Sequence, residues 1–180
     1  MRSDYVVTTA ARVGQTLRAI PDYPKPGILF QDITPVLRDG PLLRDVVAEM
    51  IRPFQDAEVT HVLGIEARGF ILGGAVAVAL GAGFVPARKP GKLPWERATE
   101  AYDLEYGSDS LEAHRDAVGA GNRVLIVDDV LATGGTARAA GQLARGLGAE
   151  LVGWTFLLEI AGLGGRDRLQ GARHHVVTTA

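Results

Sequence analysis

The stretch VLIVDDVLATGGTA, residues 124–137, decides the fold of this chain. Four apolar residues typical of a buried strand run into Asp128 and Asp129, and a Thr/Gly cluster then leads into a helical pattern. Because side chains alternate between the two faces of a strand, a continuing strand cannot turn both carboxylates to one solvated side. Burying an unpaired carboxylate is costly, so we expect the strand to end at the two aspartates. In open α/β sheets, that end of a strand is where ligands bind.

The Thr/Gly turn at residues 133–136 has the composition of an anion-binding site. Glycine lets backbone N–H groups close on a phosphate, and the start of the following helix adds about half a positive charge. A ribose 5-phosphate meets both demands of the motif, since its phosphate fits the turn while its two ring hydroxyls donate to the carboxylates. The residues alone leave open a capped turn with two solvated aspartates. A Walker A loop does not fit, because no Lys follows the second glycine, Gly135.

Outside this stretch, apolar runs of strand length alternate with helical patterns. We expect strands at residues 60–65, 83–87, 122–127 and 150–158, and helices at residues 9–20, 43–54, 69–80 and 135–147. This alternation predicts an α/β fold, with a mostly parallel twisted sheet and helices on both of its faces. Thr8 or Thr9 is placed to cap the first helix. Asp39 is placed to cap the second helix, which Pro53 should kink or end.

Two segments lack this order. Residues 21–37 carry four prolines and a glycine around a short apolar core, so we expect a small, irregular N-terminal arm at about residues 20–38 with at most one brief strand. Residues 89–119 show no clear period and hold scattered prolines and glycines. A long irregular insertion in a compact domain is either disordered or a functional lid, and we place a flexible lid loop at about residues 89–107.

Composition and charge narrow the class of protein. With 180 residues, 47% of them apolar, the chain fits one domain over residues 1–180, and a formal net charge of -2 gives no basis for a nucleic-acid partner. The absence of cysteine excludes disulfides and thiolate metal sites and fits a reducing compartment, so we expect a cytoplasmic protein. The uncharged run at 69–87 is long enough to span a bilayer, but Gly81, Gly83 and Pro86 divide it, so we expect no membrane partner.

The stretch at 124–137 resembles the phosphoribosyl pyrophosphate motif of the class I phosphoribosyltransferases over its whole length. Further segments resemble those of the adenine phosphoribosyltransferases in the same order: IPDYPKPGILFQDITPVL at 20–37, GIEARGF at 64–70, FVPARKPGKLP at 84–94 and YDLEYGSDSLEAH at 102–114. The resemblance implies the class I fold and a purine-salvage transfer of the phosphoribosyl group to adenine, giving AMP and pyrophosphate. It also implies a homodimer, and Mg²⁺ held mainly through substrate oxygens rather than by protein ligands.

The resemblance further implies roles for individual residues. Asp128 and Asp129 would hold the ribose hydroxyls, and the 5-phosphate would lie on Ala132, Thr133, Gly134, Gly135 and Thr136. The pyrophosphate would meet Glu66, Ala67, Arg68, Arg88, Lys89 and Lys92. The base would lie near Leu29 and Phe30, with Leu131 and Ala132 below it. Glu105, beside Tyr106 at the end of the lid, and Arg68 would be the catalytic residues.

The chain departs from the family pattern at two positions. Gln31 stands where the family usually has an arginine, which removes a fixed charge beside the base, and Trp95 within the lid is unusual. Gln31 keeps open a phosphoribosyltransferase for another nucleobase. A third hypothesis is a non-catalytic regulator that senses phosphoribosyl pyrophosphate.

Overall fold

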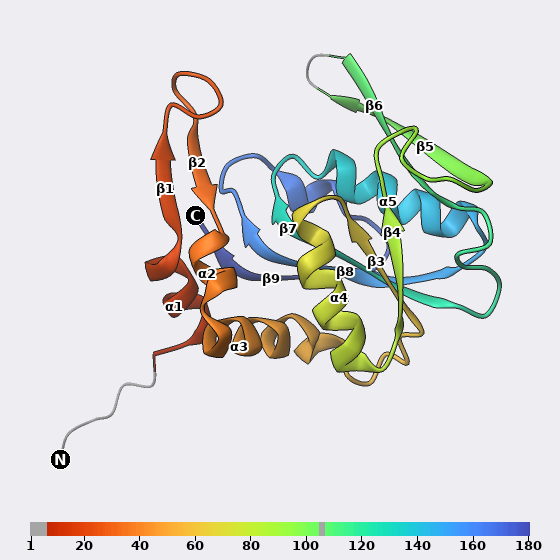
Figure 1. Ribbon diagram of the computed structural model, residues 1–180, viewed down its shortest axis with the longest axis horizontal. Helices are drawn as coiled ribbons and strands as arrows, with labels where there is room; N and C mark the ends of the chain where they lie inside the picture. Colours follow the sequence, from red (N-terminus) through yellow and green to blue (C-terminus); the bar gives the residue numbers. More distant parts are fainter. Residues whose placement is uncertain (1–6, 105–106) are drawn as a thin grey trace.

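Five parallel strands form the central sheet, in the order β4-β3-β7-β8-β9 (Figure 1). The computed structural model describes residues 7–104 and 107–180, and all side chains in these ranges except those of residues 103, 104, 107 and 108. The strands are β3 (His61–Ile65), β4 (Gly83–Ala87), β7 (Arg123–Leu131), β8 (Glu150–Glu159) and β9 (Arg173–Thr179). The predicted parallel α/β sheet is therefore confirmed.

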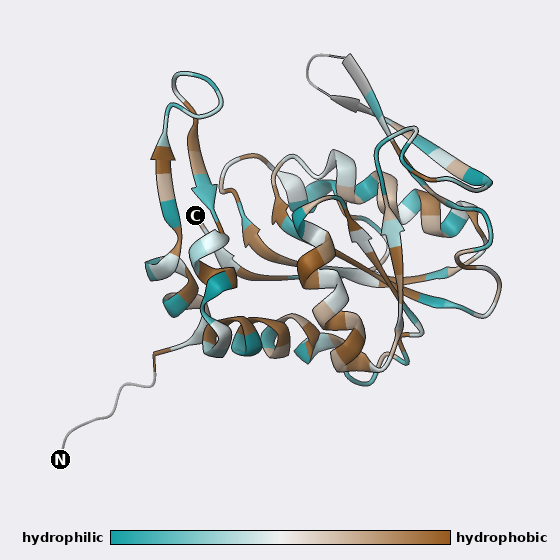
Figure 2. Ribbon diagram, viewed as in Figure 1, coloured by the Kyte–Doolittle hydropathy of each residue, from teal (hydrophilic) through white to brown (hydrophobic). Residues whose placement is uncertain are grey.

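Helices cover both faces of the sheet, as predicted. The helices are α1 (Thr9–Thr16), α3 (Gly40–Ile51) and α4 (Arg68–Leu80) on one face and α5 (Gly135–Gly146) on the other. Along β3, Val62 packs with α1, α3 and α4, whereas Leu63 packs with α5, because successive side chains leave a strand on opposite faces. Figure 2 shows the largely hydrophobic α4 against the sheet and a hydrophilic tip on the arm.

The first two helices begin where their caps predict. The Thr8 hydroxyl accepts a hydrogen bond from Ala11 N at 3.2 Å, and Asp39 accepts one from Leu42 N at 3.0 Å. The second predicted helix is α3, which ends at Ile51 and passes into a 3-10 turn over Arg52–Phe54 that contains Pro53. The first helix stops at Thr16, however, so its predicted extension to residue 20 is wrong.

The arm is more regular than its prolines predict. β1 (Arg18–Pro21) and β2 (Leu29–Asp32) pair as an antiparallel hairpin, and α2 (Thr34–Arg38) follows. The expectation of at most one brief strand is wrong because the prolines lie outside the middle of both strands, where they remove no necessary hydrogen bond. They lie at the end of β1, in the connecting loop and at the start of α2. This pairing also draws residues 18–21 away from the first helix. The hairpin stands at the edge of the domain, beside the carboxyl ends of the central strands (Figure 1).

The segment expected as an irregular lid also contains a hairpin. β5 (Arg97–Leu104) and β6 (Gly107–His114) pair antiparallel over eight residues each. One face of the hairpin packs against the domain, since Tyr102, Leu111 and Ala113 are buried in the core that also includes α5. Glu100 and Asp109 lie on this same face, opposite Leu111 and Tyr102, so the apolar residues do not recur at every second position of the sequence. The prediction of a structureless loop is wrong for this part of the segment.

The uncharged run at 69–87 divides as predicted. It forms most of α4, a turn in which Gly81 has a φ of 66°, and strand β4. Gly81 permits this left-handed turn because it lacks a side chain. Within the described ranges, none of the helices has the length and apolarity needed to cross a membrane.

Candidate active site

The candidate site lies where the strand order of the sheet reverses direction. From β3 the chain crosses through α4 to β4 on one side, whereas from β7 it crosses through α5 to β8 on the other. Since β3 and β7 are parallel neighbours, the loops after their carboxyl ends and the starts of α4 and α5 diverge around one crevice. Parallel α/β sheets bind ligands at such a point. The loop after β4 lies on the same edge of the sheet.

The two aspartates of the opening motif lie within β7, so the prediction that the strand ends before them is wrong. β7 continues to Leu131, and Asp128 pairs in register with Phe156 of β8. The strand can continue because both carboxylates have partners. Asp128 Oδ1 accepts a hydrogen bond from Asp129 N at 2.8 Å, and Asp129 forms an ion pair with Arg68 at the start of α4. A tertiary contact thus removes the cost that the sequence argument assigned to burying these groups.

The environment of the aspartates makes them unequal. Burial, together with the negative charge of Asp129, raises the pKa of Asp128 well above its usual value. Asp129 is buried but keeps the guanidinium of Arg68 as its counter-charge. Gly69 lets α4 approach, because a Cβ there would lie 2.7 Å from Asp128 Oδ1. The carboxylates therefore form a closely packed acceptor pair at the entrance of the crevice.

Arg68 connects this pair to the arm. Its guanidinium carbon lies 5.7 Å from the centroid of the Phe30 ring, and Phe30 itself meets Tyr23 edge-on with ring centroids 5.1 Å apart. The neighbouring Leu29 is exposed, and its side chain leaves β2 on the opposite face from Phe30. Of the two residues predicted to contact a base, the structure directs Phe30 toward Arg68.

The turn between β7 and α5 forms a small cradle. A cavity of about 80 Å³ is lined by Asp128, Val130, Leu131, Ala132, Thr133, Gly134, Gly135, Thr136 and Ala137, so the five residues predicted to hold a phosphate lie together. Gly134, the N-cap of α5, has a φ of 80° and no side-chain cap, which leaves N–H groups of the first turn free for an anion. Leu131 is buried at the base of this cavity.

Sequence reasoning missed the support behind this cradle. A Cβ on Gly134 would lie 2.4 Å from Gly165 O, and a Cβ on Gly165 would lie 2.3 Å from Ala132 O. Two backbones thus touch where a side chain on either glycine would separate them. The Gly164–Gly165 pair that follows β8 was the signal available in the sequence.

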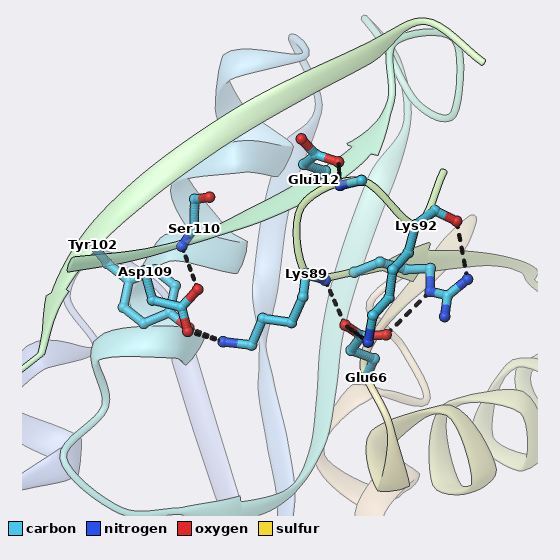
Figure 3. Close-up of polar contacts among 9 residues, drawn as sticks. Glu66, Lys89, Lys92, Tyr102, Asp109, Ser110 and Glu112 are labelled. Carbon is cyan, nitrogen blue, oxygen red and sulfur yellow. Dashed lines mark hydrogen bonds and ion pairs between the residues drawn. The ribbon is translucent and has the colours of Figure 1, made fainter. Parts of the chain in front are cut away.

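Glu66 gathers the cations that follow β4 (Figure 3). Its buried carboxylate accepts hydrogen bonds from Arg88 Nε at 3.1 Å, Lys92 Nζ at 3.1 Å and the backbone N of Lys89 at 2.6 Å. Burial raises the pKa of Glu66, but these three hydrogen bonds together outweigh it, so the pKa lies below its usual value. The Glu66–Ala67 peptide bond is cis. The structure therefore brings together the predicted residues from the loops after β3 and β4.

Lys89 points away from this group, toward the β5–β6 hairpin. Its Nζ donates a hydrogen bond to Tyr102 Oη at 2.6 Å and forms an ion pair with Asp109. Burial lowers the pKa of Lys89, but the hydrogen bonds to Asp109 and Tyr102 raise it by more, so the pKa lies above its usual value. Sequence reasoning missed both partners, although each lies three residues from the predicted pair Glu105–Tyr106 and Lys89 was itself predicted.

A second buried glutamate, also missed, holds the hairpin to the loop after β4. Glu112 accepts hydrogen bonds from Gly91 N at 3.0 Å and Arg97 Nε at 3.1 Å. Its backbone exchanges two hydrogen bonds with Arg88, of 2.8 and 2.7 Å. The inner end of the hairpin is therefore fixed to the sheet.

Four residues singled out in the sequence remain. Glu105 and Tyr106 lie outside the described residues. Trp95 is exposed. Gln31 pairs in register with Ala19 inside the β1–β2 hairpin.

The assembled groups suit a sugar phosphate that carries a second anionic group. The cradle offers backbone N–H groups, the aspartates offer acceptors for hydroxyls, Arg68 and the loop after β4 offer positive charge, and Phe30 offers an aromatic face. Within the described residues, no group of three or more His, Cys, Asp or Glu side chains is arranged to hold a metal ion.

The chain is similar to known proteins over most of its length. The pattern of a family described as phosphoribosyl transferase domain matches residues 37–174. An adenine phosphoribosyltransferase of Myxococcus xanthus is 56% identical over 171 residues, which make up 95% of this chain and 92% of that protein. The crystal structure of adenine phosphoribosyltransferase from Rhodothermus marinus matches with a TM-score of 0.92 at 51% identity, covering 96% of this chain and 98% of that one.

A structure with bound ligands is also similar. The adenine phosphoribosyltransferase of Saccharomyces cerevisiae, complexed with adenine and D-2,5-dideoxy-2,5-imino-altritol 1,6-bisphosphate, matches with a TM-score of 0.88 at 39% identity. The match covers 94% of this chain and 98% of the yeast chain.

Proposed function

Because this chain belongs to the adenine phosphoribosyltransferase family, we propose that it transfers the phosphoribosyl group of 5-phosphoribosyl 1-pyrophosphate to adenine, forming AMP and pyrophosphate in purine salvage. The observation that carries the proposal is the juxtaposition of the Asp128–Asp129 pair with the cradle at residues 132–136. The Asp128–Asp129 pair and the cradle are separated by only two residues, so one ribose 5-phosphate can reach the carboxylates with its hydroxyls and the cradle with its phosphate.

The arrangement assigns a role to each part of the substrate. The 5-phosphate binds the N–H groups at the start of α5, and the ribose hydroxyls donate to Asp128 and Asp129. N9 of adenine, stacked near Phe30, attacks the anomeric carbon while pyrophosphate leaves, and positive charge develops on the ribose ring. Arg68 lies between Phe30 and Asp129, so it is placed to meet the leaving group beside the reacting carbon.

The leaving group carries several negative charges and needs more cations than Arg68 alone. Arg88 and Lys92 are held in one place by Glu66, and Lys89 lies beside them. These side chains come from the loop after β4, on the same edge of the sheet as the cradle. Glu105, which lies between β5 and β6 in the sequence, is proposed to act near the base nitrogen and the leaving group.

Magnesium fits this site as a partner of the substrate. Mg²⁺ keeps several waters and prefers phosphate oxygens with one or two carboxylates, and Asp128 and Asp129 are the carboxylates at the crevice. When bound, the ion would neutralise charge on the pyrophosphate. Arg68 already neutralises Asp129, which favours coordination mainly through substrate oxygens.

A homodimer is proposed on the evidence of one apolar face. A groove of about 390 Å³ between α3 and α4 is lined by Gly40, Leu43, Arg44, Val47, Ala48, Ile51, Ala75 and Ala79. Beside it, α4 exposes Ile71 and Val78, and the edge strand β4 exposes Phe84. A contiguous apolar face of this kind is typical of a protein–protein interface. We propose that a second copy of the chain covers this face. We also propose that the enzyme is cytoplasmic.

The experiment that tests the function is pyrophosphate release by the purified protein with phosphoribosyl pyrophosphate and magnesium. Adenine, hypoxanthine, guanine, xanthine and uracil are supplied separately, and the nucleotide product is identified. We expect turnover with adenine. Turnover only with another base would overturn the adenine assignment and point to Gln31, and ligand binding without turnover would overturn the enzymatic one.

A further inference from the structure

Lys89 contacts both strands of the β5–β6 hairpin at one point (Figure 3). Its ammonium donates to Tyr102 Oη at 2.6 Å and pairs with Asp109, and Tyr102 Oη donates to Asp109 Oδ2 at 3.2 Å. Tyr102 and Asp109 stand directly opposite each other in the hairpin register. The three groups therefore form a closed triangle that joins the loop after β4 to the hairpin.

This lysine differs from its two cationic neighbours. Arg88 and Lys92 share the carboxylate of Glu66, which belongs to the loop after β3, so their anchor is part of the sheet edge. The carboxylate partner of Lys89 belongs to the hairpin instead. The Lys89 and Asp109 side chains are 35% and 28% exposed, so solvent and small anions reach the pair.

An anion that binds Lys89 must meet Asp109. An ammonium has three N–H donors, and Tyr102 and Asp109 take two of them. The carboxylate neutralises the lysine and repels a second anion placed beside it. A pyrophosphate group that binds Lys89 well would therefore displace Asp109.

We propose that Asp109 is a positioning residue that competes with the leaving pyrophosphate for Lys89, so that the anion, when it binds, takes the place of the Asp109 carboxylate beside this ammonium. The proposal rests on the proposed function, because that function places pyrophosphate beside Lys89. In this arrangement Asp109 keeps Lys89 charged and in place while the site holds no anion. It also lowers the affinity of the site for pyrophosphate.

The inner end of the hairpin has contacts of its own with the loop after β4. Glu112 binds Gly91 N and Arg97 Nε, and its backbone pairs with Arg88. None of these contacts involves Lys89. Exchange at Lys89 therefore leaves the inner end of the hairpin attached to the loop after β4.

The test is the affinity for inorganic pyrophosphate with magnesium, measured by calorimetry on the full chain. Asp109→Asn keeps the size of the side chain and removes its charge, so we expect the Kd to fall about tenfold, which corresponds to about 1.4 kcal/mol. Tyr102→Phe, which removes one acceptor from Lys89, should shift the Kd in the same direction by less. We expect the KM for phosphoribosyl pyrophosphate to fall with the Kd, without a rise in kcat.

A double-mutant cycle with Lys89→Met separates this role from a general charge effect. With the ammonium absent, Asp109→Asn should leave the Kd unchanged. Asp116→Asn, which removes an exposed carboxylate from the turn after β6, is the matched charge control and should leave it unchanged as well. Damage to the fold would weaken binding, so it cannot produce the expected tightening.

Three results would overturn the inference. They are a Kd that is unchanged or higher in Asp109→Asn, an equal tightening in the Lys89→Met background, and an equal tightening in Asp116→Asn. Any of these in a chain that turns over adenine leaves the proposed function standing. A wild-type chain that neither turns over a base nor binds pyrophosphate would overturn both.

Discussion

The contact between Arg68 and Asp129 shapes the site at the scale of single residues. It lets a carboxylate lie buried inside a strand, and it directs the guanidinium along the crevice toward Phe30. Asp128, with its raised pKa, adds an acceptor beside a charge that is already balanced. A sugar with two adjacent hydroxyls matches this unequal pair.

The ribose assignment predicts the behaviour of a double variant. Asp128→Asn with Asp129→Asn retains the size of both side chains but weakens the acceptors for the ribose hydroxyls and for the charge that develops on the ring. We expect turnover to fall by at least about 100-fold. Pyrophosphate release measures this, and circular dichroism checks that the fold is retained. Near-normal turnover would contradict the assignment. Asp56→Asn with Asp116→Asn removes the same charge at exposed positions and is the matched control.

At the scale of elements, two loops are joined by one buried carboxylate. Glu66 follows β3, and its partners Arg88, Lys89 N and Lys92 follow β4. Since β3 and β4 are adjacent parallel strands, their carboxyl ends bring the loops within reach. Backbone contact between Gly134 and Gly165 joins the cradle to the segment after β8 in a similar way.

This junction predicts a pH dependence of stability. The folded state lowers the pKa of Glu66, so its contribution is fully present above the unfolded pKa, about 4.3, and is lost as the pH falls through the folded value. Glu66→Gln removes that contribution. Chemical unfolding at a series of pH values should show the wild type more stable at pH 7, with the difference shrinking below about pH 4.3. A difference that stays constant down to pH 3 would refute this account. Glu96→Gln, at an exposed position, serves as control.

At the scale of the whole molecule, the apolar face on α3 and α4 lies apart from the crevice. The two helices pack on the face of the sheet opposite α5 (Figure 1), whereas the crevice lies at the carboxyl ends of β3 and β7. A second copy on this face would therefore leave the entrance of the crevice open. The uncharged run at 69–87 supplies both a buried side of α4 and this exposed face.

The dimer proposal predicts the effect of a single charge. Val78 is 84% exposed on α4, so Val78→Asp should cost the monomer little while it places an unpaired charge in the interface. Light scattering after size-exclusion chromatography should show a dimer for the wild type and a monomer for the variant. Val7→Asp, also at an exposed apolar position, should remain dimeric. A variant at Val78 with unchanged mass would mean that this face is not the interface.

The sequence by itself determined the parallel α/β sheet, the helices around it and the position of the cradle. These features depend on local signals: apolar runs, helical periodicity, the caps Thr8 and Asp39, and the glycines of residues 133–136. Family resemblance added the candidate residues, most of which the structure brings to one edge of the sheet. Their roles stay predictions.

Only the tertiary structure decided where strands continue and which charges meet. β7 runs through its two aspartates because Arg68, 61 residues away, pairs with one of them. The β1–β2 and β5–β6 hairpins and strand β9, which the sequence patterns did not predict, form through pairing with their partner strands. Asp109, Tyr102 and Glu112 could not be paired with Lys89 or Gly91 from sequence, because the energy of an ion pair depends on distance and burial, which only the folded chain fixes.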